Sequence, residues 1–217
     1  MVQKIYPVEK PRNNYEHDYI TGALIKIYNF VNANKKAVFA AVLIVVITAA
    51  GALFFEIKKS RSQENSWKEL AMSVMFGDAN SLDTVPAKYP GTDAALYAGY
   101  FKADALYSAG DYAKSIPVFK DLAAARNKEL AAIAQLSLAA AQQADGKFDD
   151  SVKTASDFLA RYPDHFALPQ AYLTLALSQE LAGRKEAAVE NYKIITARFP
   201  KTYFGAFAAN KLKDLAK

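Results

Sequence analysis

The chain has 217 residues, of which 52% are hydrophobic and 23% charged, a composition typical of folded proteins and not of disordered ones. It has no cysteine, which excludes disulfides, cysteine-ligated metals, a thiol nucleophile and a lipid-modified cysteine. Its only histidines, His17 and His165, are far apart in the sequence. The net charge is only +5 and the signs alternate along the chain, whereas a nucleic-acid binder concentrates its basic residues. We therefore expect no catalytic site, no metal, no cofactor and no nucleic-acid partner.

Residues 1–36 predict an N-terminal arm with one amphipathic helix. The first 17 residues are polar and contain Pro7 and Pro11, so we expect them to be poorly ordered. Apolar residues then recur at helical spacing at Ile20, Leu24, Ile27, Tyr28 and Val31. Asp18 or Thr21 is a candidate N-cap. Such a helix can lie on a bilayer surface, pack against a partner or extend a membrane span, and the sequence does not choose among these.

Residues 37–55 predict a transmembrane helix. Ala37 to Phe55 contains no charged residue, and 11 of its 19 residues are Val, Leu, Ile or Phe. A helix of this length covers roughly 28 Å, close to the ~30 Å hydrocarbon core of a bilayer. A buried core helix and a cleaved signal peptide, with Ala50-Gly51-Ala52 as cleavage site, are the alternatives; the 36 residues that precede it are too many for an ordinary signal peptide. Nearby lysines and arginines are balanced on the two sides, so charge does not set the orientation.

Residues 56–89 are expected to connect the span to the rest of the chain. One helical face carries Trp67, Leu70, Val74, Met75 and Phe76, and Gly77 ends it. A short helix from Leu82 to Lys88, with Ser81 as its N-cap, is expected to follow. We interpret the two helices as an atypical first repeat that caps a helical array.

Residues 90–217 contain an internal repeat. Gly110, Gly146 and Gly183 lie 36 and 37 residues apart, and each separates two helical patterns. Alanine stands seven residues before each of these glycines, at Ala103, Ala139 and Ala176, and a small residue stands five residues after each, at Ser115, Ser151 and Ala188. Small residues at fixed places allow neighbouring helices to pack closely. A period of this length with two helices per unit predicts a helical solenoid.

Aromatic-proline pairs mark the ends of the same units. Tyr89-Pro90, Tyr162-Pro163 and Phe199-Pro200 each close a helical stretch. The mark missing between the first two should fall near residue 127, where we expect Arg126-Asn127 to end a helix. A closing helix is expected from Tyr203 to Leu215. The predicted fold is all-α, a single transmembrane helix followed by a helical-hairpin solenoid.

The small residues around each glycine and the proline near the end of each unit resemble the tetratricopeptide repeat. The resemblance covers about residues 90–217, with a period of 36–37 residues where the family has about 34. The whole layout, with Asn34-Lys35-Lys36 before one span, is similar to the ancillary subunit of the bacterial Sec translocon. The Tyr-Pro closures also resemble those of the periplasmic cell-division coordinator and of outer-membrane assembly proteins.

This resemblance implies a single-pass protein of the bacterial inner membrane, with its N-terminus in the cytoplasm and its repeats in the periplasm. It implies a scaffold for protein–protein interaction that contacts translocon subunits, periplasmic chaperones or exported clients, and the lipid bilayer through Ala37–Phe55. An envelope scaffold for cell division or outer-membrane assembly is the alternative function. Phosphate-binding, hydrolase, zinc-protease and calcium-binding motifs are absent from the sequence, so we do not expect an enzyme.

In repeat arrays the first helix of each hairpin lines a concave surface that binds partners. Tyr97, Tyr100, Asp104 and Tyr107 are spaced 3, 4 and 3 residues apart and share one helix face. The repeat register extends the predicted partner-binding face to later units. Its candidate residues are Tyr97, Tyr100, Asp104, Tyr107, Leu136, Gln143, Gln170, Leu173, Leu177 and Glu180.

Overall fold

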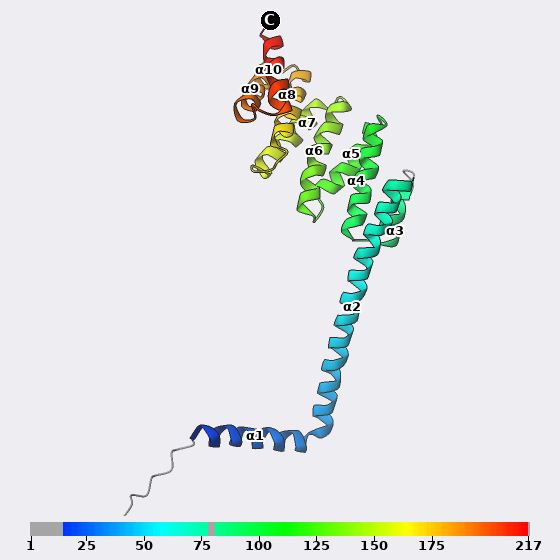
Figure 1. Ribbon diagram of the computed structural model, residues 1–217, viewed down its shortest axis with the longest axis vertical. Helices are drawn as coiled ribbons and strands as arrows, with labels where there is room; N and C mark the ends of the chain where they lie inside the picture. Colours follow the sequence, from blue (N-terminus) through cyan, green and yellow to red (C-terminus); the bar gives the residue numbers. More distant parts are fainter. Residues whose placement is uncertain (1–14, 78–80, 217) are drawn as a thin grey trace, which may run out of the picture. The chain divides into compact units, whose positions relative to one another are not determined.

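The computed structural model describes residues 15–77 and 81–216, and within these ranges all the regular structure is helical (Figure 1). Contacts divide the chain into two units, Met1–Lys58 and Lys59–Lys217. The expected all-α class is therefore confirmed. Most of the polar arm predicted at residues 1–17 lies outside the described residues.

The first unit contains α1 (Tyr15–Ala33) and the beginning of α2 (Lys35–Phe76). The helix α1 already includes Tyr15, so its start precedes the caps expected at Asp18 or Thr21. Its apolar side chains are exposed, among them Ile20, Leu24, Ile27, Tyr28 and Val31. These exposed side chains can contact a bilayer or a partner protein.

The helix α2 carries the apolar segment and is long and apolar enough to cross a membrane. The mean hydropathy of its apolar window is 2.8, and none of that window is buried within the protein. Within residues 37–55 the one side chain with a hydroxyl group is Thr48. This hydroxyl donates to the carbonyls of Ile44 and Val45 at 3.0 and 2.9 Å, so its hydrogen bonds are made within the helix. Length and composition thus support a candidate span. The helix then continues without interruption to Phe76, just before the expected end at Gly77.

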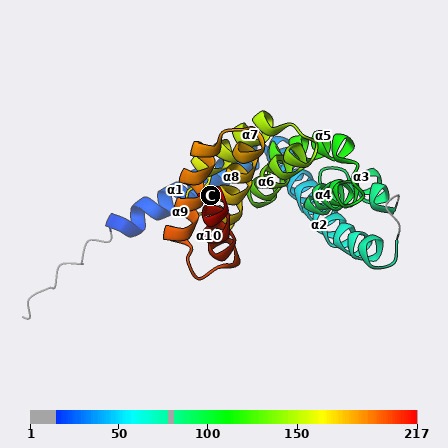
Figure 2. The ribbon, with the colours of Figure 1, turned by 90° about the horizontal axis from the view of Figure 1, so that it is seen from above.

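The second unit is an array of antiparallel helical hairpins. Its elements after α2 are η1 (Ser81–Asp83), α3 (Thr84–Lys88), α4 (Asp93–Ser108), α5 (Tyr112–Ala123), α6 (Lys128–Ala144), α7 (Phe148–Arg161), α8 (Leu168–Leu181), α9 (Lys185–Arg198) and α10 (Tyr203–Leu215). From α4 to α10 each helix packs against the next in chain order, and α6 also contacts α8 (Figures 1 and 2). The closing helix has the predicted bounds. The short helix expected at Leu82–Lys88 is divided into η1 and α3.

The glycine period corresponds to three identical turns. Gly110, Gly146 and Gly183 have φ values of 81°, 76° and 78°, a conformation that a side chain would strain. In the first turn the Gly110 amide donates to the Tyr107 carbonyl at 3.0 Å, and the next amide reaches the Leu106 carbonyl at 2.9 Å. The same pair of bonds recurs after α6 and α8. These are Schellman turns, and they reverse the chain at the same place in each hairpin.

The predicted small residues all lie in the interior. Ala103, Ala139 and Ala176 in the first helices of the hairpins are fully buried, and so are Ser115, Ser151 and Ala188 in the second helices. Large side chains such as Phe119, Phe158 and Tyr192 fill the remaining core. The sequence register of the repeat is thereby confirmed.

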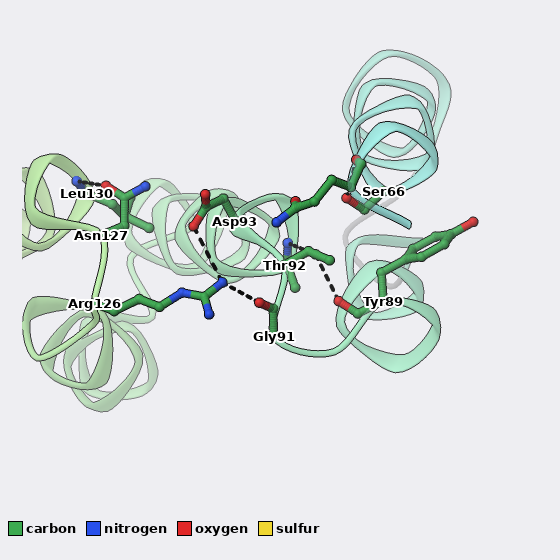
Figure 3. A network of polar contacts seen from close by, with 10 residues as sticks. Ser66, Tyr89, Gly91, Thr92, Asp93, Arg126, Asn127 and Leu130 are labelled. Atoms are coloured by element: carbon green, nitrogen blue, oxygen red, sulfur yellow. Dashed lines mark hydrogen bonds and ion pairs between the residues drawn. The ribbon is translucent and has the colours of Figure 1, made fainter. Parts of the chain in front are cut away.

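The boundary near residue 127 differs in detail from the prediction. α5 ends at Ala123, and Asn127 begins the next helix, since its side chain accepts a hydrogen bond from the Leu130 amide at 3.1 Å. Arg126 points toward the loop before α4, where it donates to the Gly91 carbonyl and lies 3.8 Å from the Asp93 carboxylate (Figure 3). An arginine that bridges two loops therefore stands where the other units have an aromatic-proline pair.

Candidate partner-binding site

A hollow of about 230 Å³ opens on the side of the array formed by the first helices of the hairpins. Its lining comes from α4, α5, α6 and α8, so three successive hairpins build it together. We call it the α4–α6–α8 hollow, and its lining residues are Tyr100, Asp104, Tyr107, Phe119, Ser137, Ala140 and Gln170. Four of the ten residues predicted from the sequence thus lie around one cavity: Tyr100, Asp104, Tyr107 and Gln170.

Tyr100 joins the first two hairpins at this hollow. Its hydroxyl lies 3.1 Å from the Ser137 hydroxyl on α6, and either oxygen can donate. Its ring packs edge-on against Phe119, whose centroid is 5.6 Å away. Tyr100 is therefore held from both ends, by a hydrogen bond at the tip and by the core along the ring.

Tyr107 and Asp104 lie one turn apart on α4. Burial, followed by the proximity of Tyr112 and Asp104, raises the pKa of the Tyr107 hydroxyl above its ordinary value. The rings of Tyr107 and Tyr112 are 5.3 Å apart, so this phenol is half-buried beside a second one. Asp104 is exposed and is one of the residues that line the hollow. The hollow is therefore lined by a half-buried phenol and by a carboxylate on the same helix.

Tyr97 and Leu136 lie elsewhere on the predicted face. The ring of Tyr97 packs against Trp67, with centroids 5.4 Å apart, near the start of the array. Leu136 is 5% exposed and packs in a core cluster with Phe158 and Leu168. Neither residue lines the hollow.

Gln143 and Glu180 are engaged in bonds between helices. The Gln143 amide donates to the Thr174 carbonyl at 3.2 Å and to the Ser178 hydroxyl at 2.8 Å. Ser178 in turn lies 2.8 Å from the Ser151 hydroxyl, so a polar chain crosses from α6 through α8 to α7. These contacts fix the spacing of the second and third hairpins.

Glu180 anchors the end of the array. One carboxylate oxygen accepts from the Tyr192 hydroxyl at 2.7 Å and the other from Lys211 at 2.9 Å. Burial of Glu180 opposes its ionisation, but the bonds from Lys211 and Tyr192 together outweigh it and lower its pKa below the ordinary value. Leu173 and Leu177, also predicted on the face, are half-buried and pack against the core of this last hairpin. This end of the face thus stabilises the array.

Ser137, Ala140 and Phe119 line the hollow but are not among the predicted residues. The repeat register contains the signal for one of them. Ala140 follows the buried Ala139 as Asp104 follows Ala103, so the two occupy equivalent places in successive units. Phe119 lies on α5, the second helix of its hairpin. Residue spacing along the first helices therefore does not predict that it lines the hollow.

A second, apolar groove of about 310 Å³ lies near the start of the array. It is formed by the last turns of α2 and by α4, and its lining residues are Trp67, Leu70, Ala71, Val74, Met75 and Phe101. No cluster of three metal-binding side chains occurs among the residues that the structure describes.

Hairpins of this geometry, joined by identical turns and stacked in chain order, define a helical repeat protein. The family model for the tetratricopeptide repeat-like domain matches residues 28–166, well over half of the chain, and the protein belongs to this family. A second model, for the tetratricopeptide repeat, matches residues 170–202. Such repeats point to a scaffold for protein–protein interaction, and this fold is typically not enzymatic.

Solved structures share the fold at low identity. One of them is the crystal structure of the nearly identical TPR-like repeats of a putative kinesin light chain from Podosopora anserina. It is 17% identical to this chain, with a TM-score of 0.54, and the match covers 73% of this chain and 85% of that one. The MamA RS-1 ArsTM double mutant is 15% identical, with a TM-score of 0.50, over 71% of this chain and 94% of that one. No curated protein matches the sequence.

Proposed function

We propose that this protein is a membrane-anchored scaffold that holds a partner polypeptide on the face formed by α4, α6 and α8. The observation that carries the proposal is the hollow that Tyr100, Asp104 and Gln170 line together from α4 and α8. The hollow combines tyrosine rings with a carboxylate and an amide. The buried polar residues of the described chain, in contrast, are serines, threonines and one glutamine, and none of them is charged. Tyrosines of this kind are frequent at interaction hot spots.

The anchor in this proposal is the apolar segment of α2, residues 37–55. An uncharged stretch of this length is favourable in a bilayer and costly to expose to water. We place the N-terminus in the cytoplasm and the repeats of residues 90–217 in the periplasm of a bacterium, with residues 56–89 as the atypical first repeat. Support for this orientation comes from the similarity of the layout to the ancillary subunit of the bacterial Sec translocon. The count of lysines and arginines on the two sides of the segment does not contribute to it.

The partner in this proposal is a subunit of the protein-export machinery, a periplasmic chaperone or an exported client. A scaffold for cell division or outer-membrane assembly is the second candidate, because aromatic-proline closures at Tyr162 and Phe199 also occur in proteins of that kind. The two differ in which proteins remain bound to the full chain after mild solubilisation of the membrane.

Two measurements test the proposal. Alkaline phosphatase fused after Lys217 should be active in a bacterial host, while a fusion before Ile20 should be inactive; the reverse pattern contradicts the orientation. Full-length protein purified from crosslinked membranes should carry export-machinery proteins or chaperones. Recovery of division or outer-membrane assembly proteins alone favours the second candidate.

A further inference from the structure

The chemistry of the α4–α6–α8 hollow indicates what kind of side chain it accepts. Its volume of about 230 Å³ is smaller than the ~300–1,000 Å³ of pockets that enclose whole drug-sized ligands. The space suits one long side chain projecting from a bound polypeptide. Phe119, 1% exposed, and Ala140 give part of the wall an apolar character, which suits a methylene stem.

Every polar side chain of the lining can accept a hydrogen bond, and one of them, Asp104, is a carboxylate. Asp104 supplies a carboxylate, and the hydroxyl pair of Tyr100 and Ser137 keeps lone pairs beyond their mutual bond. Gln170 adds an amide, which contains one acceptor oxygen. None of the residues that line the hollow is a lysine, arginine or histidine. The lysine nearest to Asp104 in sequence, Lys102, pairs with Asp83 at 2.7 Å.

Two tyrosines share the helix face of that aspartate. Tyr100 precedes Asp104 by four residues and Tyr107 follows it by three, so all three occupy one face of α4. The faces of tyrosine rings attract cations within about 6 Å of the ring centroid. Asp104 is the only residue with a charged side chain in this lining, so it is the charge that a ligand meets.

We propose that the α4–α6–α8 hollow binds the cationic side chain of a lysine or arginine in the partner polypeptide, with the charge at Asp104 and the stem between Tyr100 and Tyr107. This inference rests on the proposed function, because it assigns a chemistry to the partner held on the same face. An anionic side chain would meet the like charge of Asp104, and a purely apolar one would displace water from this carboxylate without replacing its hydrogen bonds.

The test uses the full chain in lipid nanodiscs and a random dodecapeptide library displayed on phage. Selection is run in parallel on the wild type, on Asp104→Asn and on Asp157→Asn, an exposed aspartate of α7 that serves as the matched control. We expect lysine or arginine to be enriched at one position on the wild type and on Asp157→Asn, and not on Asp104→Asn. A selected arginine peptide is then synthesised again with citrulline, which keeps the shape and removes the charge.

The citrulline peptide should bind the wild type about tenfold more weakly than the arginine peptide, as expected for one charge-assisted bond at a partly exposed site. On Asp104→Asn the two peptides should bind equally, which places the lost interaction at this pair. One result would overturn this inference and leave the proposed function standing. In that result, peptides bind the wild type without a preference for lysine or arginine, and their binding is lost in the variant Gln170→Lys, whose longer side chain fills the face. Peptides that bind all variants equally, Gln170→Lys included, or no binding at all, count against both.

Discussion

The hydroxyl oxygens of Tyr100 and Ser137 lie 3.1 Å apart and join α4 to α6 at the edge of the hollow. The two residues are 37 positions apart in the sequence, one repeat period, so the bond connects successive units. Tyr100 therefore has two roles, because its ring packs against the Phe119 core while its tip borders the hollow.

We expect Tyr100→Phe and Ser137→Ala each to reduce the free energy of unfolding by about 1 kcal/mol, because each removes a part-buried hydrogen bond. The double variant should cost less than the sum, since both single changes remove the same bond. Urea denaturation of the full chain in micelles measures the three values. Tyr203→Phe, at a residue 73% exposed, is the control and should change nothing. Strict additivity would show that the two hydroxyls do not interact.

The repeat register was predictable because packing constrains it tightly. Glycine at the three turns and a small residue at Ala139 or Ser151 are required by a left-handed turn and by close helix contact, so both appear as spacing in the sequence. The hollow was predictable only in part. It depends on which neighbouring helix supplies Phe119 and Ser137, and that is a property of helix rotation.

Residue spacing along a single helix does not predict the contacts of Glu180 and Leu136. Both occupy the predicted face by spacing, but Glu180 bonds to Tyr192 and Lys211, and Leu136 packs against Phe158. The partners of Glu180 lie on α9 and α10, and the placement of those helices follows from tertiary packing. Spacing on one helix identifies a face and does not say what the next helix places against it.

Ala176→Leu should destabilise the array by about 1–3 kcal/mol, because Ala176 is fully buried and added methylenes overpack the interior. A loss of this size lowers the thermal midpoint by several degrees in a domain of this length, at roughly 2–4 °C per kcal/mol. Circular dichroism of the full chain at increasing temperature measures it. Ala197→Leu, at an exposed position of α9, should melt like the wild type.

Glu180→Gln should lower the free energy of unfolding at neutral pH by about 1 kcal/mol, because the amide does not carry the negative charge that pairs with Lys211. The side chains of Glu180 and Lys211 are 26% and 30% exposed. The pKa of Glu180 is lowered in the folded state, so its contribution is complete above the ordinary value of 4.5 and is lost as the pH falls through the lowered value. The difference between wild type and variant should shrink below about pH 4.5.

Chemical denaturation at pH 7 and at pH 3 measures this difference. Glu190→Gln is the matched control, because Glu190 pairs with Lys193 on the surface, 69% and 59% exposed, and should contribute little at either pH. A difference for Glu180→Gln that stays constant across the pH range would mean that the charge of Glu180 does not stabilise the fold.

A position on the bilayer surface is one of the three placements that the sequence leaves open for α1, and spin labels test it. The chain has no cysteine, so single cysteines report on one site each. Spin labels at Leu24 and Ile27 on the exposed apolar side should be accessible to oxygen, which concentrates in lipid, and a label at Asn29 should be accessible to a water-soluble nickel complex. A label at Val46 tests the span independently. Equal accessibility at Leu24 and Asn29 would refute a surface-bound helix.

In the proposed function a partner lies against the face formed by α4, α6 and α8, and site-specific photo-crosslinking in native membranes tests this contact most directly. A photoreactive amino acid at Gln170, which lines the hollow, is compared with one at Lys153, an exposed residue of α7 outside its lining. We predict a discrete crosslinked protein from Gln170 and none from Lys153. Crosslinks of equal yield from both positions, or from Lys153 alone, would contradict the claim.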